Sequence, residues 1–147
     1  MSTLTIDLFA KSVAETSAWV EDFMELSGED NPEHALHALR ATLHALRDQL
    51  TLDQNAHLSA QLPTMLRGLY FESWDPHGSY VKRASLEEFL ERISEDYGRH
   101  TRDFDPADVA SSVFSVLGTR VNDVIRKIEA TLPKEYRTLW EFPLSEV

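Results

Sequence analysis

The stretch LPTMLRGLY at residues 62–70 recurs as LPKEYRTLW at residues 132–140, seventy positions further along the chain. The two copies share leucine and proline at their first two positions, then an arginine and a leucine, and both end in an aromatic residue. Proline disfavours helical geometry at the residue before it and lacks a backbone N–H donor. Each Leu-Pro pair therefore predicts a corner where one helix ends and another begins, and its recurrence predicts a duplicated helical architecture.

Helix start and stop signals surround the first corner. Gly28 is a helix stop, and Asn31 followed by Pro32 is an N-cap with proline in the first turn. Thr51 and Gln54 have the spacing of a capping box, in which each side chain bonds the backbone N–H of the other residue. These signals predict four helices, over about residues 6–27, 32–50, 51–62 and 63–71.

The same order of signals follows in the second half. Ser85 with Glu88 predicts a capping box, Gly98 a helix stop, and Asp105 before Pro106 another N-cap. A further helix is predicted after Asn122 and ends at the second corner. We therefore predict an all-α fold, a single compact domain over residues 1–147 built from two tandem repeats of about four helices each, related by a pseudo-two-fold axis. We place repeat one at about residues 6–71, an inter-repeat segment at 72–84 and repeat two at about 85–142.

The composition limits the classes of partner and the compartment. The 147 residues carry 25 acidic side chains against 14 Lys and Arg, a formal net charge of −11. Affinity for nucleic acid and for anionic membranes comes from basic side chains, so we expect neither as a partner. The chain has no cysteine, no basic segment followed by an apolar run at its start, and no run of about 20 apolar residues. A cytoplasmic location is expected.

The segment ALHALRATLHALRDQL, residues 35–50, carries two apolar faces. At about 100° per residue, its leucines fall on one stripe and Ala38, Ala41 and Ala45 fall on the opposite side. A helix with two apolar faces packs from two directions, so a central position in the fold is predicted. Between these faces lies a set of polar side chains that we call the basic band: His37, Arg40, His44 and Arg47.

The basic band has two interpretations. In the first, its members are side chains at the edge of a central helix, paired with the plentiful acids of the chain. In the second, the band is a binding site for a small anion or an acidic peptide, because guanidinium and imidazole groups suit carboxylates and phosphates. The candidate binding residues are then Arg40, His44, Arg47 and, from just beyond the first corner, Arg67.

Several of these stretches, in this order and spacing, resemble a known family. They are ALRATLHALRDQL, AQLPTMLRGLYFESWDP, EEFLERI, SSVFSVL and LPKEYRTLW, and together they span about Ser17 to Trp140. The chain resembles the bacterial family called domain of unknown function 2267. That resemblance implies a small, duplicated, all-helical protein, and it implies no activity, cofactor or catalytic residue.

Catalytic and metal chemistry lack their usual patterns. His34 and His37 are three residues apart, but no His-Glu-x-x-His motif or paired Glu-x-x-His motifs accompany them. The acids around Pro106 do not have the spacing of a calcium loop. No Gly-x-Ser-x-Gly elbow and no glycine-rich phosphate loop is present. We therefore predict no catalytic residues, no metal site and no cofactor.

Three hypotheses of function remain. The leading one is a non-catalytic interaction or scaffold module, whose partner is an unknown protein or small molecule and whose simplest form is a homo-oligomer. The second is the small-anion or acidic-peptide binder that uses the basic band. The third is an enzyme of unrecognised chemistry. A deep polar pocket beside the helix at 32–50 favours the second hypothesis, and an exposed apolar patch favours the first.

Overall fold

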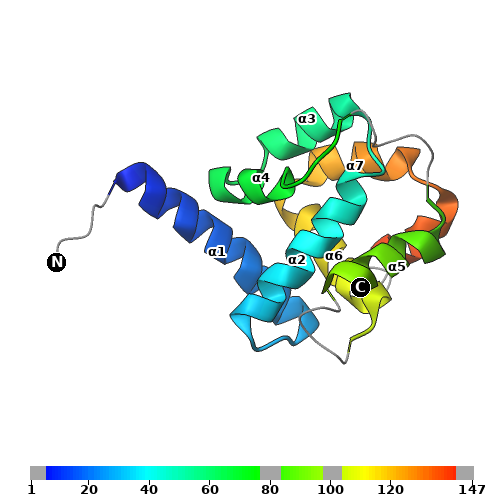
Figure 1. The fold of residues 1–147 in the computed structure, drawn as a ribbon, viewed down its shortest axis with the longest axis horizontal. Helices are drawn as coiled ribbons and strands as arrows, with labels where there is room; N and C mark the ends of the chain where they lie inside the picture. The colour runs from blue at the N-terminus through cyan, green and yellow to red at the C-terminus, as the bar shows by residue number, and fades with distance from the viewer. Residues whose placement is uncertain (1–5, 77–83, 98–103, 142–147) are drawn as a thin grey trace.

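The computed structural model describes residues 6–76, 84–97 and 104–141, and the secondary structure within these ranges is helical throughout (Figure 1). The all-α prediction is therefore confirmed. The elements are α1 (Asp7–Ser27), α2 (Pro32–Arg47), α3 (Leu52–Ala60), α4 (Thr64–Tyr70), α5 (Leu86–Tyr97), α6 (Pro106–Arg120), α7 (Asn122–Thr131), the 3₁₀ turn η1 (Lys134–Tyr136) and α8 (Arg137–Glu141).

Most of the predicted helix ends are confirmed by their hydrogen bonds. Gly28 has φ 82° and its N–H donates to the Met24 carbonyl, as a left-handed C-terminal glycine does. The Asn31 side chain accepts N–H groups from the first turn of α2. Both capping boxes are formed, one at Thr51 and one at Ser85, and Asp105 caps α6. The predicted stop at Gly98 and most of the inter-repeat segment lie outside the described residues.

Two predicted boundaries are wrong. The helix predicted over about residues 32–50 ends at Arg47, and a tight turn carries the chain to Leu50. Asn122 does not precede α7 but is its first residue, and its side-chain amide donates back to the Gly118 carbonyl of α6. Asn122 therefore satisfies the end of one helix instead of capping the start of the next.

The two Leu-Pro corners have the same proline geometry. Pro63 has φ −54° and ψ 149°, and Pro133 has φ −55° and ψ 147°. Each proline precedes its helix as the N-cap residue, one position earlier than its predicted place within the helix. The chain continues as an α-helix after the first corner and as a 3₁₀ turn followed by α8 after the second. The pseudo-two-fold relation of the two halves stays a prediction.

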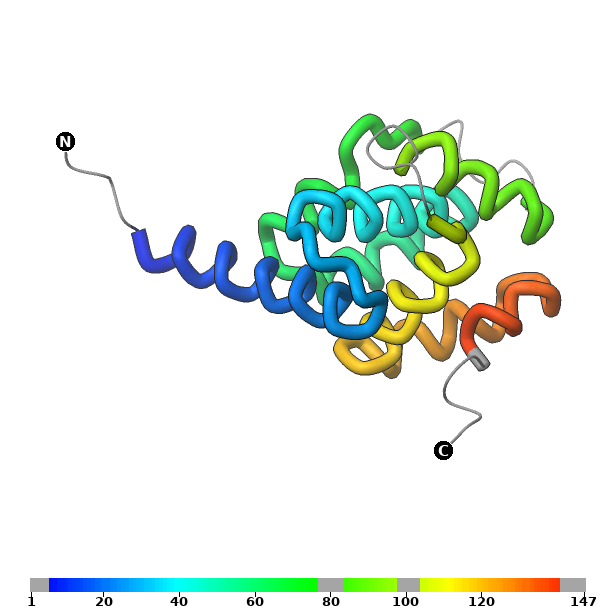
Figure 2. The backbone as a smooth tube through the Cα atoms, turned by 90° about the horizontal axis from the view of Figure 1, so that it is seen from below, coloured from blue at the N-terminus to red at the C-terminus, as the bar shows by residue number. Residues whose placement is uncertain are grey.

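Helix α2 is the centre of the fold, as its two apolar faces predicted. It packs against α1, α4, α5 and α6, and its leucine and alanine faces are both buried (Figure 2). Buried side chains from both halves of the chain form the core, among them Trp19, Phe23, Leu39, Leu43, Leu46, Leu62, Phe89, Ile93, Val113, Leu117, Leu132 and Leu139. Leu69 is partly buried and packs against this core.

The first turns of α1 extend away from the rest of the protein in both views (Figures 1 and 2). The C-terminal half of α1 packs through Trp19 and Phe23 into the core. The N-terminal half touches α4, where the Ser12 hydroxyl accepts the Met65 N–H at 2.8 Å. We call residues 6–13 the α1 arm, and its larger apolar side chains are exposed: Ile6, Leu8, Phe9 and Val13.

Candidate functional site

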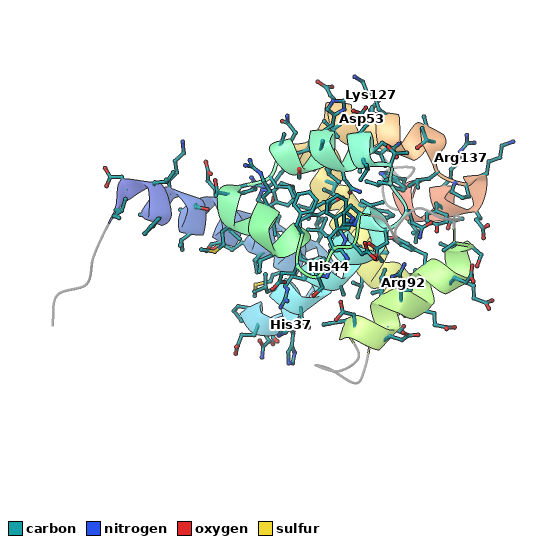
Figure 3. All side chains as sticks on the ribbon, turned by 45° about the horizontal axis from the view of Figure 1, so that its top comes forward. His37, His44, Asp53, Arg92, Lys127 and Arg137 are labelled. Atoms are coloured by element: carbon teal, nitrogen blue, oxygen red, sulfur yellow. The ribbon has the colours of Figure 1, made fainter. Side chains whose placement is uncertain are left out.

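The structure places the basic band along one side of α2, facing the turn that follows α4. The Arg40 Nη2 atom lies 2.6 Å from a Glu72 carboxylate oxygen. Arg47, two helical turns further on, donates to the Glu72 backbone carbonyl at 2.8 Å. Both guanidinium groups therefore point in the same direction, as their spacing of seven residues predicted. His37 also has a partner, and Figure 3 places it toward the start of α2.

Arg47 is buried although it is charged. Its Nε donates to Asp48 at 2.9 Å, and its Nη1 donates to the carbonyls of Tyr70 and Glu72 at 2.9 and 2.8 Å. The side chain is only 6% exposed, so these bonds replace those that water would make. Arg47 thus holds the end of α4 and the following turn against α2.

Arg67 does not join the basic band. From α4 it donates its Nε to the Ser59 carbonyl at 2.8 Å and its Nη2 to the Leu62 carbonyl at 3.2 Å. These carbonyls belong to the last turn of α3 and the corner after it, and that of Ser59 also accepts the Leu62 N–H at 3.1 Å. Of the four candidate residues, Arg67 therefore stabilises the first corner, and the other three lie on the side of α2 that faces α4 and the turn after it.

His44 has a defined tautomer. Its Nε2 lies 2.7 Å from the Leu69 carbonyl, and a carbonyl only accepts, so Nε2 carries the proton and donates. Its Nδ1 lies 3.9 Å from an Asp96 carboxylate oxygen. The pKa of His44 is lowered below its ordinary value, chiefly by burial. The positive charges of Arg47 and Arg40 also lower it, whereas the hydrogen bond to Leu69 and the negative charge of Asp96 raise it. The imidazole is therefore neutral at pH 7, and its Nδ1 is a hydrogen-bond acceptor.

A cleft of about 240 Å³ lies between α2 and α5. The small side chains of Ala41 and Ala45 leave the space, and Figure 3 shows His44 and Arg92 on the two facing helices. Asp48 accepts from Arg47 and, at 2.8 Å, from Arg92 across the cleft. The charged and polar groups around the cleft are His44 and Arg47 from α2, Asp48 directly after it, and Arg92, Glu95 and Asp96 from α5.

Half of this site was not predicted from the sequence. The basic band is one face of one helix, whereas Arg92, Glu95 and Asp96 belong to α5 in the second half of the chain. The available signal was the charged spacing within ERISEDY, residues 91–97, where positions 92, 95 and 96 share a face opposite the buried Ile93 and Tyr97. Only the packing of α5 on α2 reveals which charges that face meets.

His44 makes stability depend on pH. Below about pH 6.5 the unfolded chain binds a proton at His44, whereas the folded protein binds it only at lower pH because its pKa is lowered. Acidification from about pH 7 to about pH 5 should therefore reduce the free energy of unfolding. The His44→Gln variant lacks this contribution, so its stability should fall less over that range. Urea denaturation of both proteins at the two pH values measures the difference, and equal losses would contradict the assignment.

Two features are not found among the described residues. Among them, no group of three or more His, Asp or Glu side chains is arranged to hold a metal ion. None of the helices in these ranges has both the length and the apolar character that crossing a bilayer requires.

Comparison with known proteins gives a family but no activity. A family model described as "Uncharacterized conserved protein (DUF2267)" matches residues 16–139. None of the curated proteins compared with the chain matches it. The match covers both Leu-Pro corners, α2 and α5, and begins after the α1 arm.

Proposed function

We propose that this chain, which belongs to the DUF2267 family of uncharacterized conserved proteins, is a non-catalytic interaction module that pairs with a second copy of itself through the α1 arm. The observation that carries the proposal is the exposed apolar surface of that arm. Phe9 is 57% exposed and Val13 48% exposed, on a helix that extends from the protein (Figure 1). Contiguous apolar surface of this kind marks interaction sites.

The spacing of apolar residues along α1 supports a helix as the partner. Ile6, Phe9 and Val13 begin a series in steps of three and four residues that continues with Thr16, Val20 and Phe23. The later members pack within the protein, and the first three do not. We call this series the seam of α1. Its second half is covered by the rest of the protein, and its first half, in the α1 arm, is not.

The charges on the α1 arm are compatible with a second copy as that helix. A chain of net charge −11 repels its own copies over most of its surface. On the α1 arm and the next turn, the charged residues are Asp7, Lys11 and Glu15. At about 100° per residue, each lies at least about 100° from the nearest seam residue. Two arms can therefore meet along the seam with no like charges between them.

The direction of pairing follows from the position of the arm. The rest of the protein lies at the C-terminal end of each arm, so two parallel arms would bring the two proteins into collision (Figure 2). Antiparallel arms place the two proteins at opposite ends of the pair. An overlap of about eight residues is only about 12 Å long, so the association should be weak and dependent on concentration.

Sedimentation equilibrium over a range of protein concentrations tests the pairing. The wild-type protein should show a monomer–dimer equilibrium, and Phe9→Glu should remain a monomer because it places a charge within an apolar seam. Leu52→Glu is the matched control, since Leu52 is 59% exposed on α3, away from the arm, and should leave the equilibrium unchanged. A wild-type protein that stays monomeric at every concentration would show that the arm does not pair with its own copy.

We also propose that residues 6–71 and 85–142 are tandem copies of one helical unit. The nearly equal backbone angles of Pro63 and Pro133 support this, as do the second helices of the two halves, α2 and α6, which both start with a capping Asn31 or Asp105 followed by proline. The proposed pairing is independent of the duplication, because the α1 arm precedes the family match at residue 16. Self-association through the arm is therefore a property that we assign to this chain and not to the family.

A further inference from the structure

One end of the α2–α5 cleft holds two hydrogen-bond acceptors that face each other. His44 donates from Nε2 to Leu69, which leaves the lone pair of Nδ1 directed toward Asp96 at 3.9 Å. The Asp96 carboxylate is half exposed, and His44 is its only partner among the described residues. Neighbouring Glu95 has no hydrogen bond or ion pair with a described residue. Among the described residues, this end of the cleft therefore holds acceptors without a matching donor.

The other end holds donors that are not fully used. Arg47 donates from Nε and Nη1, and its Nη2 makes no hydrogen bond to any described residue. Arg92 uses Nη2 to bind Asp48 and is otherwise half exposed. The two guanidinium groups are connected through Asp48, which accepts a hydrogen bond from each. This end of the cleft presents N–H groups to an acceptor.

The two ends are about one helical turn apart. Asp48, the C-cap residue of α2, follows His44 by four residues, and Arg92 and Asp96 are four residues apart on α5, a rise of about 6 Å in each case. The contacts pair His44 with Asp96 and Asp48 with Arg92, so the two helices run in opposite directions along the cleft. The acceptor end and the donor end of the cleft are therefore about as far apart as the two ends of a small molecule.

We propose that this cleft binds a small zwitterion, an amino carboxylate whose ammonium group lies between His44 Nδ1 and Asp96 and whose carboxylate meets Arg47 and Arg92. The ammonium donates to both acceptors, and the carboxylate accepts from the guanidinium groups. The volume of about 240 Å³ limits the ligand to a few carbon atoms between its two charges. This site is independent of the α1 arm and of the pairing proposed above.

The charges around the cleft favour a zwitterion over the anion predicted for the basic band. Asp48, Glu95 and Asp96 outnumber Arg47 and Arg92, and His44 is neutral. An anion alone would supply no donor to Asp96 and Glu95, which have none among the described residues, and it would add to the negative charge. A zwitterion adds no net charge and satisfies both ends.

Titration monitored by amide NMR shifts of α2 and α5 tests the proposal. The probes are glycine, beta-alanine and gamma-aminobutyrate, which increase the distance between the two charges, with butylamine and butyrate as analogues that carry one charge. One zwitterion of the series should bind at least about tenfold more tightly than either analogue, because it alone uses both ends of the cleft. Equal affinity for butylamine, or no shift with any zwitterion, would overturn the proposal.

Two substitutions test which charged group of the ligand binds at each end of the cleft. Asp96→Asn should weaken the best zwitterion and butylamine about tenfold and leave butyrate unaffected, whereas Arg92→Gln should weaken the same zwitterion and butyrate and leave butylamine unaffected. Asp123→Asn and Arg126→Gln, on the exposed side of α7, are the matched controls and should change no affinity. All four positions are exposed, so the variants should fold. Equal effects of Asp96→Asn on all probes would show that the ends do not act separately.

Discussion

Replacing Leu43 with alanine should lower the free energy of unfolding by about 2–5 kcal/mol. Leu43 is 1% exposed and lies in the middle of α2, which packs against four other helices. Truncation removes apolar contacts and leaves a cavity, because neighbours held from several sides cannot move far enough to fill it. Urea denaturation of the variant and the wild-type protein, followed by circular dichroism, measures the loss.

The control for this prediction is Leu52→Ala. Leu52 is also a helical leucine, but its side chain is 59% exposed at the start of α3, so its truncation should change stability by less than about 0.5 kcal/mol. A similar small change for Leu43→Ala would place the core elsewhere and remove α2 from the centre of the fold.

The helices that the sequence predicted well are those whose ends depend on neighbouring residues. Thr51 and Ser85 each reach an N–H only three residues away, and Gly28 needs only its own left-handed conformation. Such signals require no tertiary contact, so they can be recognised from the sequence alone. The same holds for the central position of α2, because its two apolar faces are a property of one helix.

The end of α2 depends on residues that lie further along the chain. The Arg47 carbonyl accepts from the Asn55 side chain at 3.2 Å, and Asn55 also accepts from the buried Tyr70 hydroxyl. The last turn of α2 is therefore completed by α3 and α4, and no glycine or proline marks the position. Local start and stop signals could not predict this boundary, and the prediction continued α2 to Leu50.

The candidate site also has a part that the sequence predicted and a part that it did not. The shared direction of Arg40 and Arg47 follows from helical geometry and was predicted. Their partner Glu72 lies in a turn, and the facing acids Glu95 and Asp96 come from α5. A net charge of −11 predicts that carboxylates will be near, but only the packing of α5 on α2 decides which ones. The change from an anion site to a zwitterion site rests on those unpredicted acids.

Arg47 connects the folded core to this cleft, and its removal should have the largest effect of any single polar substitution that we consider. Its side chain satisfies the carbonyls of Tyr70 and Glu72 and neutralises Asp48. Arg47→Met keeps an unbranched apolar stem but leaves two carbonyls and part of a carboxylate without donors in a buried place. Removing one partner of a buried charged pair costs about 3–5 kcal/mol, so we expect a loss of that size in the free energy of unfolding.

Arg40→Met is the matched control, because it makes the same substitution two turns earlier on the same face of α2. The Arg40 side chain is 29% exposed and the Glu72 side chain that it pairs with is 42% exposed, so water can replace the lost ion pair. Pairs of this kind contribute about 0–1 kcal/mol, and the stability of Arg40→Met should fall by no more than that. Urea denaturation of both variants gives the comparison. Equal losses would contradict the assignment of Arg47 as the residue that holds α4 and its following turn against α2, since the two arginines differ chiefly in burial and in the backbone carbonyls that Arg47 alone satisfies.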